Sequence, residues 1–85
     1  MGRPRVVLYT RVGCHLCDDM KRVVEVVAGT VPIDFHEVDI DTNDDLRRLY
    51  DWEVPVLEVD GRKAFKYRVG ERELRQRLQH ADHRD

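Results

Sequence analysis

The fold of this chain is decided by the stretch VVLYTRVGCHLC, residues 6–17. The segment Arg5–Tyr9 is apolar and β-branched without alternation, a pattern typical of a central strand that is covered on both faces. Beyond the following loop the period becomes helical. Apolar side chains then recur at helical spacing, on Leu16, Met20, Val23, Val24 and Val27. Because Gly29 and Pro32 are stop signals, we expect a helix over residues 15–28.

Two cysteines, Cys14 and Cys17, lie at this switch from strand to helix. A thiol at a helix N-terminus faces unpaired N–H groups and the positive end of the helix dipole, which favour its thiolate. A second thiol one turn along can attack a mixed disulfide formed on the first. We therefore predict Cys14 as the nucleophile and Cys17 as the resolving thiol. His15 is either a solvated residue or tunes the pair through a charge or a hydrogen bond to the Cys14 sulfur.

Three further strands are predicted, over residues 33–40, 54–59 and 62–69. Asp60-Gly61 between the last two is a strong hairpin signal, because both central positions of such a turn need positive φ. Phe65, Tyr67 and Val69 alternate with Lys66 and Arg68, as in an edge strand with one solvated face.

Two further helices complete the pattern. Thr42 and Asp45 have the spacing of a capping box, so a short helix is expected to follow them. A last helix is expected from Gly70, with Leu74, Leu78 and Ala81 on its apolar face. The order strand, helix, strand, helix, hairpin, helix predicts an α/β fold. Its four-stranded mixed sheet should pair the first two strands in parallel and carry helices on both faces.

The composition excludes several classes of protein. The 85 residues suffice for one small domain, and the formal net charge is −2. That near-neutral total argues against a binder of nucleic acid or anionic membrane. The charge is uneven: residues 34–60 carry ten acidic and two basic side chains, net −8, whereas residues 62–77 carry seven basic and two acidic ones, net +5. We interpret the basic stretch as a solvated face. The longest apolar run is too short for a membrane span or a signal peptide.

The cysteine pair has alternative uses. Two cysteines three positions apart cannot staple a small secreted fold, so we expect a single cytoplasmic domain over residues 1–85. Structural zinc needs four ligands, and His80 and His83 could complete a set with the two cysteines. Zinc and an inert thiol pair remain open beside redox chemistry, which the strand-to-helix switch favours.

The chain resembles a glutaredoxin-like protein of the thioredoxin fold over nearly its whole length. The resemblance rests on residues 7–17, Val38-Asp39-Ile40-Asp41, Val54-Pro55-Val56 and the Asp60-Gly61 hairpin. A Cys-x-x-Cys motif alone is moderately specific, whereas its combination with a later Val-Pro that begins a strand is strong. The resemblance implies a thioredoxin-like fold of order βαβαββα.

Further site residues follow from the resemblance. It implies that the Val54-Pro55 bond is cis and lies against the cysteines, and that the Val54 backbone pairs with an extended substrate. The alternative is a trans proline that merely begins an edge strand. Arg11 stands where glutaredoxins often carry a Lys that meets a glutathione carboxylate, which an Arg can contact bidentately. Gly70 stands where the family holds the γ-glutamyl end of glutathione.

The chain departs from the family pattern at three positions. It has one glycine before the last helix where the family has two, Leu16 in place of an aromatic residue, and Glu53 in place of Thr. These departures disfavour tight glutathione binding. Trp52, next to the proposed substrate loop, is interpreted as a packing residue rather than part of a groove.

We therefore predict a thiol–disulfide oxidoreductase that acts on disulfides of proteins or small thiols. We expect no bound cofactor or metal, a monomer, and glutathione or a thioredoxin-type reductase as electron donor. Glutathione would then be a co-substrate. The alternative from another class is an iron–sulfur or metal-binding module that uses Cys14 with an external thiol.

Overall fold

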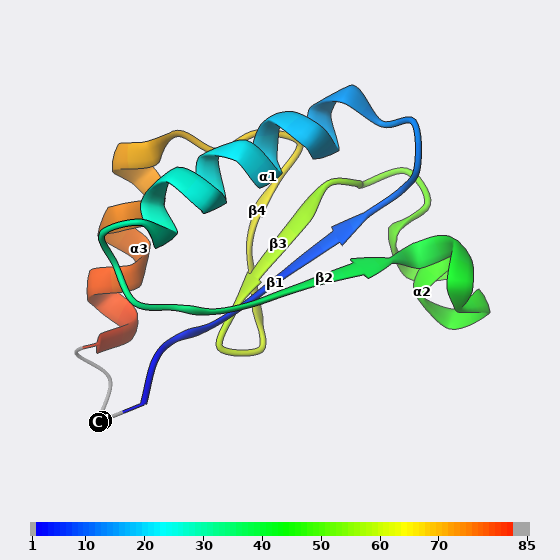
Figure 1. The fold of residues 1–85 in the computed structure, drawn as a ribbon. Helices are drawn as coiled ribbons and strands as arrows, with labels where there is room; N and C mark the ends of the chain where they lie inside the picture. Colours follow the sequence, from blue (N-terminus) through cyan, green and yellow to red (C-terminus); the bar gives the residue numbers. More distant parts are fainter. Residues whose placement is uncertain (1, 83–85) are drawn as a thin grey trace.

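The computed structural model describes residues 2–82, and the side chains of residues 2–79. The elements follow the predicted order (Figure 1). They are β1 (Arg5–Thr10), α1 (His15–Ala28), β2 (Asp34–Asp39), the 3-10 helix η1 (Ile40–Thr42), α2 (Asp44–Tyr50), β3 (Val56–Val59), β4 (Arg62–Lys66) and α3 (Glu71–Asp82). Within residues 2–82, no helix is long and apolar enough to span a bilayer.

The four strands form one sheet in the order β2-β1-β3-β4. β1 pairs in parallel with β2 and antiparallel with β3, and β3 pairs antiparallel with β4. The mixed sheet and the central place of β1 are therefore confirmed. Val6 and Leu8 are fully buried against one face and Val7, on the other, is 7% exposed, so the centre of β1 is buried as its unbroken apolar run predicts.

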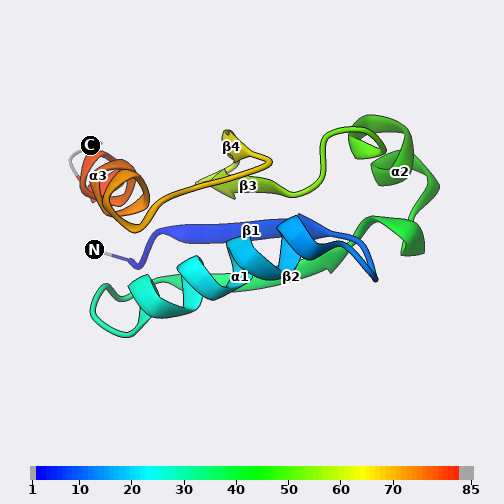
Figure 2. The ribbon, with the colours of Figure 1, turned by 90° about the horizontal axis from the view of Figure 1, so that it is seen from above.

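One face of the sheet carries the main core. α1 and α3 lie together on this face, as Figures 1 and 2 show from two directions. The buried side chains come from both helices, from the inward positions of β1 and β3, and from the link before β2. They are Val6, Leu8, Met20, Val24, Val27, Ile33, Leu57, Val59, Leu74 and Leu78. This packing fixes the start of α1, and with it both cysteines, against the sheet.

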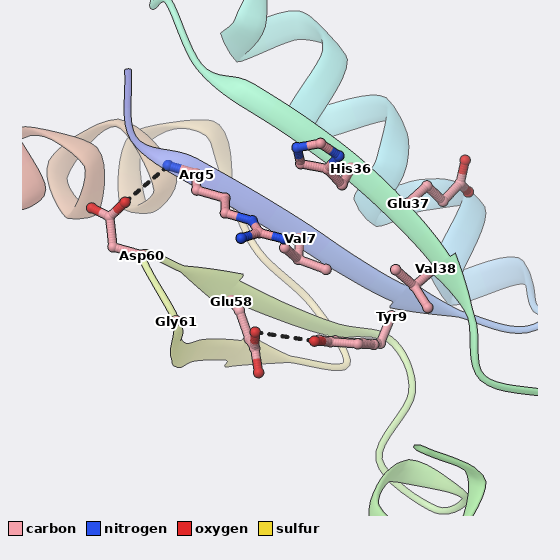
Figure 3. A pocket seen from close by; sticks show the side chains of 9 residues that line it. All are labelled: Arg5, Val7, Tyr9, His36, Glu37, Val38, Glu58, Asp60 and Gly61. Carbon is pink, nitrogen blue, oxygen red and sulfur yellow. Dashed lines mark hydrogen bonds between the residues drawn. The ribbon is translucent and has the colours of Figure 1, made fainter. Parts of the chain in front are cut away.

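The other face is covered only at one end. The short helix α2 packs Tyr50 against Ile40 and Val56, which makes a small second core. Beyond it lies an open groove of about 670 Å³ over β1 and its neighbours, lined by Arg5, Val7, Tyr9, His36, Glu37, Val38, Glu58, Asp60 and Gly61 (Figure 3). The expectation of helices on both faces is thus met only near α2, because α2 is one two-turn helix at the end of the sheet.

Three element boundaries differ from the predictions. The N-cap of α2 is Asn43, whose side chain accepts from the Leu46 N–H at 3.0 Å, so the predicted Thr42–Asp45 capping box is wrong. The Thr42 hydroxyl instead donates to the Asp39 carbonyl at 2.7 Å. β2 and β3 are shorter than predicted, since they span residues 34–39 and 56–59.

β4 also ends earlier than its alternating pattern predicts. It stops at Lys66, because Tyr67 adopts φ +70° and leaves the strand conformation. A register shift between Leu57 and Glu58 also interrupts the pairing of β3 with β4. The hairpin itself is confirmed, with φ values of +52° at Asp60 and +84° at Gly61.

Candidate active site

Cys14 and Cys17 are joined by a disulfide at the start of α1, with their Cα atoms 5.2 Å apart. Cys14 is the N-cap of the helix and is partly exposed, whereas Cys17 lies one turn inside and is 1% exposed. Cys14 is therefore the more accessible residue of the pair, and Cys17 is shielded within the protein. This is the arrangement that disulfide exchange with an external partner requires.

The backbone around Cys14 supplies donors to its sulfur. The Cys17 N–H donates to Cys14 Sγ at 3.1 Å, so the thiol takes the place of a capping oxygen. The preceding loop closes through a hydrogen bond from the Cys14 N–H to the Arg11 carbonyl at 3.3 Å. Gly13 in this loop has φ +81°, a conformation that side chains disfavour. The helix N-terminus and this N–H both stabilise negative charge on Cys14 Sγ.

His15 is the first residue of α1 and its side chain is exposed. Within the described residues, its ring makes no hydrogen bond to Cys14 Sγ, which accepts from the backbone N–H of Cys17. His15 follows Cys14 directly in the chain, but its ring makes no hydrogen bond to the Cys14 sulfur. Its role in tuning the pair stays a prediction.

The Val54-Pro55 peptide bond is cis, as the resemblance implied. Pro55 is buried, and both views of the ribbon place the segment entering β3 beside the N-terminal end of α1 (Figures 1 and 2). Within residues 2–82, the N–H and C=O of Val54 have no hydrogen-bond partner. Tyr67 fixes this segment, because its N–H donates to the Pro55 carbonyl at 2.8 Å and its hydroxyl to the Trp52 carbonyl at 3.2 Å. Val54 therefore offers a free backbone donor and acceptor.

Arg11 is held by two carboxylates from distant parts of the chain. Its Nε and Nη2 donate to Asp41 at 3.0 and 2.9 Å, and Nη2 also donates to Asp51 at 2.7 Å. The Asp41 pKa is lowered, first by the hydrogen bond from Arg11 and further by its charge, although partial burial opposes the shift. The structure thus ties the loop before Cys14 to η1 and to the turn after α2.

Gly70 lies directly before α3, and its N–H donates to Glu73 Oε1 at 3.0 Å. This contact is the returning half of a capping box, in which a carboxylate reaches back to the first free N–H of the helix. A hollow of about 330 Å³ lies between Leu16 on α1 and the segment 67–69, next to Gly70. Glu53, the third departure from the family pattern, pairs with Lys63 Nζ at 2.6 Å.

Trp52 is 88% exposed, so its interpretation as a packing residue is wrong. It lies in the turn after α2, where no strand or helix carries its side chain toward a core. Val12, Leu16 and Tyr67 are also exposed apolar side chains of the segments that surround Cys14 and Pro55. The sequence indicates the exposure of Trp52, because it lies between Asp51 and Glu53 and outside any apolar period.

Two residues expected for a zinc site cannot be placed beside the cysteines. His83 and the side chain of His80 lie outside the described residues, as does the side chain of Ala81. Among the side chains that the structure describes, no group of three or more His, Cys, Asp or Glu is arranged to hold a metal ion.

Comparison with known proteins places these features in a family context. Residues 5–79 match the model of the glutaredoxin-like domain (DUF836). An uncharacterized protein of Mycobacterium tuberculosis is 31% identical over 80 residues, which cover 88% of this chain and 82% of that protein. The solution structure of a Nitrosomonas europaea protein is similar with a TM-score of 0.79 and 29% identity, over 92% of this chain and 94% of that one. The solution structure of desulfothioredoxin from Desulfovibrio vulgaris, in its reduced form, is similar with a TM-score of 0.70 and 26% identity, over 94% of this chain and 82% of that one.

Proposed function

Because the chain belongs to the glutaredoxin-like domain family (DUF836), we propose that it is a thiol–disulfide oxidoreductase that reduces disulfides of proteins or small thiols. The thioredoxin-like fold and the Cys14–Cys17 disulfide support a redox role. The observation that carries the proposal is the unequal exposure of the two cysteines. Cys14 is partly exposed at the helix N-terminus, whereas Cys17 is buried one turn along.

The reaction proceeds in two exchanges. In the first, the Cys14 thiolate attacks one sulfur of the substrate disulfide, a mixed disulfide forms, and the other substrate sulfur leaves as a thiolate and takes up a proton. In the second, Cys17 loses its proton and attacks Cys14 Sγ, and the second substrate thiol is released. The substrate gains two electrons and two protons, and the protein is left with its internal disulfide. Two thiols of a donor, glutathione or a dithiol reductase, then return these electrons.

The helix N-terminus acts on both steps. Donors at Cys14 Sγ raise its thiolate fraction, but the nucleophilicity of a thiolate falls with its pKa, so the gain in attack rate is partly cancelled. The same stabilisation makes Cys14 a better leaving group when a donor thiol reduces the internal disulfide. We expect the site to favour turnover in this way more than raw attack rate.

We propose that the Val54 backbone holds the substrate. Its N–H and C=O are unpaired among the described residues, and the segment that enters β3 lies beside the N-terminal end of α1 (Figures 1 and 2). An extended substrate can pair with them as an added strand does, which would hold its disulfide near Cys14. This pairing uses backbone groups and is therefore tolerant of substrate sequence.

Two single variants test the proposal. Cys17→Ser should accumulate a mixed disulfide between Cys14 and the substrate, because the resolving thiol is gone. Cys14→Ser should form no mixed disulfide and lose reduction of a model protein disulfide. Mass spectrometry after acid quenching detects the adduct, and Val26→Ala, an exposed change on the distal half of α1, serves as the control. Equal activity of both cysteine variants and the wild type would refute the proposal.

A further inference from the structure

The groups expected to contact an anionic substrate are already occupied by carboxylates of the chain itself. These groups are the guanidinium of Arg11 and the N–H of Gly70. Arg11 lies in the loop before Cys14, whereas Gly70 follows Val69, which lines the hollow that Leu16, between the two cysteines, also lines. The charge of the groups that already bind them therefore affects whether the site accepts an anionic, a neutral or a cationic substrate.

Around Arg11 the balance of charge is negative. One guanidinium carries three hydrogen bonds, two to Asp41 and one to Asp51, all between 2.7 and 3.0 Å. Two carboxylates against one cation leave a local net charge of −1. An incoming carboxylate would have to displace one of them, and a bidentate Arg–carboxylate pair such as that with Asp41 is the strongest form of this contact.

At Gly70 the occupant is Glu73. Its Oε1 accepts from the Gly70 N–H at 3.0 Å and lies so close that a Cβ on Gly70 would meet it at 2.9 Å. The N-terminus of α3, which would otherwise attract an anion, therefore already carries one. This contact is independent of the Arg11 contact, since it comes from another helix.

The remaining charges near the site are of both signs. Arg47 acts on Asp41 but is paired with Asp44 at 2.6 Å, and Lys66, whose Nζ lies 5.5 Å from the centre of the Tyr67 ring, is a cation near Glu53. Lys63 is paired with Glu53 at 2.6 Å. Arg68 lines the hollow beside Leu16, but Asp19 lines the same hollow. Asp18 and Asp39, on the other side of the Cys14 loop, border the hollow that Arg11 lines.

We infer that Asp41, Asp51 and Glu73 make this site discriminate against anionic disulfides such as oxidised glutathione, and in favour of neutral or cationic disulfides. The favoured substrate is a protein disulfide with neutral or basic flanking residues. The inference rests on the proposed function and names the substrate class of the same Cys14–Cys17 site.

Three small disulfides of different charge test it: oxidised glutathione (anionic), bis(2-hydroxyethyl) disulfide (neutral) and cystamine (cationic). The reduced protein is mixed with each, quenched with an alkylating agent, and the rate of Cys14–Cys17 oxidation is measured by mass spectrometry. Each rate is divided by the rate of the same disulfide with 2-mercaptoethanol, which removes differences in intrinsic reactivity. We expect the normalised rate with cystamine to exceed that with oxidised glutathione by roughly threefold or more.

The variants separate the carboxylates from the overall charge. The triple variant Asp41→Asn, Asp51→Asn, Glu73→Gln frees Arg11 and the Gly70 N–H, so the ratio of cystamine to oxidised glutathione should fall by about tenfold. The matched control is Asp44→Asn with Asp45→Asn and Glu25→Gln, which removes the same charge elsewhere and should leave the ratio unchanged. An unchanged ratio in the triple variant, or an equal fall in the control, would overturn the inference.

A measurement on the wild type covers the case in which the triple variant does not fold. Added salt screens charges, so it should raise the normalised rate with oxidised glutathione and lower that with cystamine. Equal normalised rates for all three disulfides at every salt concentration would overturn this inference but leave the proposed function standing. A protein that oxidises with none of them would refute the proposed function as well.

Discussion

Arg11 and Asp51, forty residues apart in the chain, are joined by an ion pair of 2.7 Å between Nη2 and Oδ1. The pair connects the loop that precedes Cys14 to the turn that leads into Val54-Pro55. Asp41 adds two hydrogen bonds to the same guanidinium from η1. Arg11 therefore links the loop before Cys14 to the segment that carries Val54, in addition to the core packing of α1 and the two hydrogen bonds of Tyr67.

This ion-pair cluster gives stability a defined pH dependence. Asp41 has a pKa below its ordinary value of 3.8, chiefly because Arg11 donates to it. A carboxyl whose pKa is lowered by folding contributes stability above its unfolded pKa, and this is lost as the pH falls through the lower, folded value. Arg11→Met should thus lower the urea midpoint at neutral pH, and the difference from wild type should shrink below pH 3.8. Arg22→Met, whose pair with Asp19 is 3.8 Å long and highly exposed, should have little effect at either pH. If the difference in urea midpoint between Arg11→Met and wild type stayed the same from neutral pH to below pH 3.8, the Arg11–Asp41 contact would not be its cause.

Gly13 should be sensitive to substitution for conformational reasons alone. Its φ of +81° disfavours any side chain, although a Cβ there would meet no atom within 4 Å. Gly13→Ala should lower the free energy of unfolding by about 1 kcal/mol. Gly2→Ala, which has neither a positive φ nor a near neighbour, is the matched control and should be neutral. Urea unfolding of the two variants checks this, and equal stabilities would count against the loop conformation.

Trp52 should contribute little to stability, because 88% of it is exposed. Trp52→Ala should change the free energy of unfolding by no more than about 0.5 kcal/mol. By contrast, Leu57→Ala in the fully buried core should cost about 2–5 kcal/mol. Since Trp52 is the single tryptophan of the chain, its fluorescence in the wild type should also be quenched readily by iodide. A large stability loss or a shielded indole would restore the packing interpretation.

The Tyr50 hydroxyl should lose its proton at a higher pH than an ordinary tyrosine. Burial, and next the negative charge of Glu58, raise its pKa to about 12, and the pKa of Tyr9 is raised by the same two causes. Because folding raises this pKa, the group contributes to the free energy of unfolding at a pH below its unfolded pKa. That contribution is lost as the pH rises toward 12. Glu58→Gln should lower both pKa values, which an ultraviolet absorbance titration of tyrosinate measures. Glu25→Gln, on the exposed side of α1, should leave the titration unchanged.

The parts of the fold predicted correctly are those with local causes. β1 and α1 followed from an apolar run, a helical period and stop signals within their own residues. The same signals placed Cys14 at the helix start, where it is the N-cap. The Asp60-Gly61 turn was also local, since its conformation depends on two residues.

Contacts far along the chain, and in one case a choice between neighbouring residues, account for what the local pattern did not predict. β4 ends because Tyr67 takes φ +70°, and Tyr67 is held there by hydrogen bonds to the carbonyls of Pro55 and Trp52, which lie twelve and fifteen residues earlier. The contacts of Arg11 with Asp41 and Asp51 could not be predicted locally, because these carboxylates lie 30 and 40 residues away; its contact with a substrate carboxylate stays a prediction. The cap of α2 was misplaced by one residue, because Thr42 and Asn43 are both good caps and only the backbone selects between them.

The proposed function requires Cys14 to be the reactive thiol and Cys17 the shielded one. This can be measured by alkylating the fully reduced protein at neutral pH with less than one equivalent of iodoacetamide, followed by peptide mapping. We expect the label almost entirely on Cys14, and we expect urea to remove the preference. Equal labelling of both cysteines in the folded protein, or preferential labelling of Cys17, would contradict it.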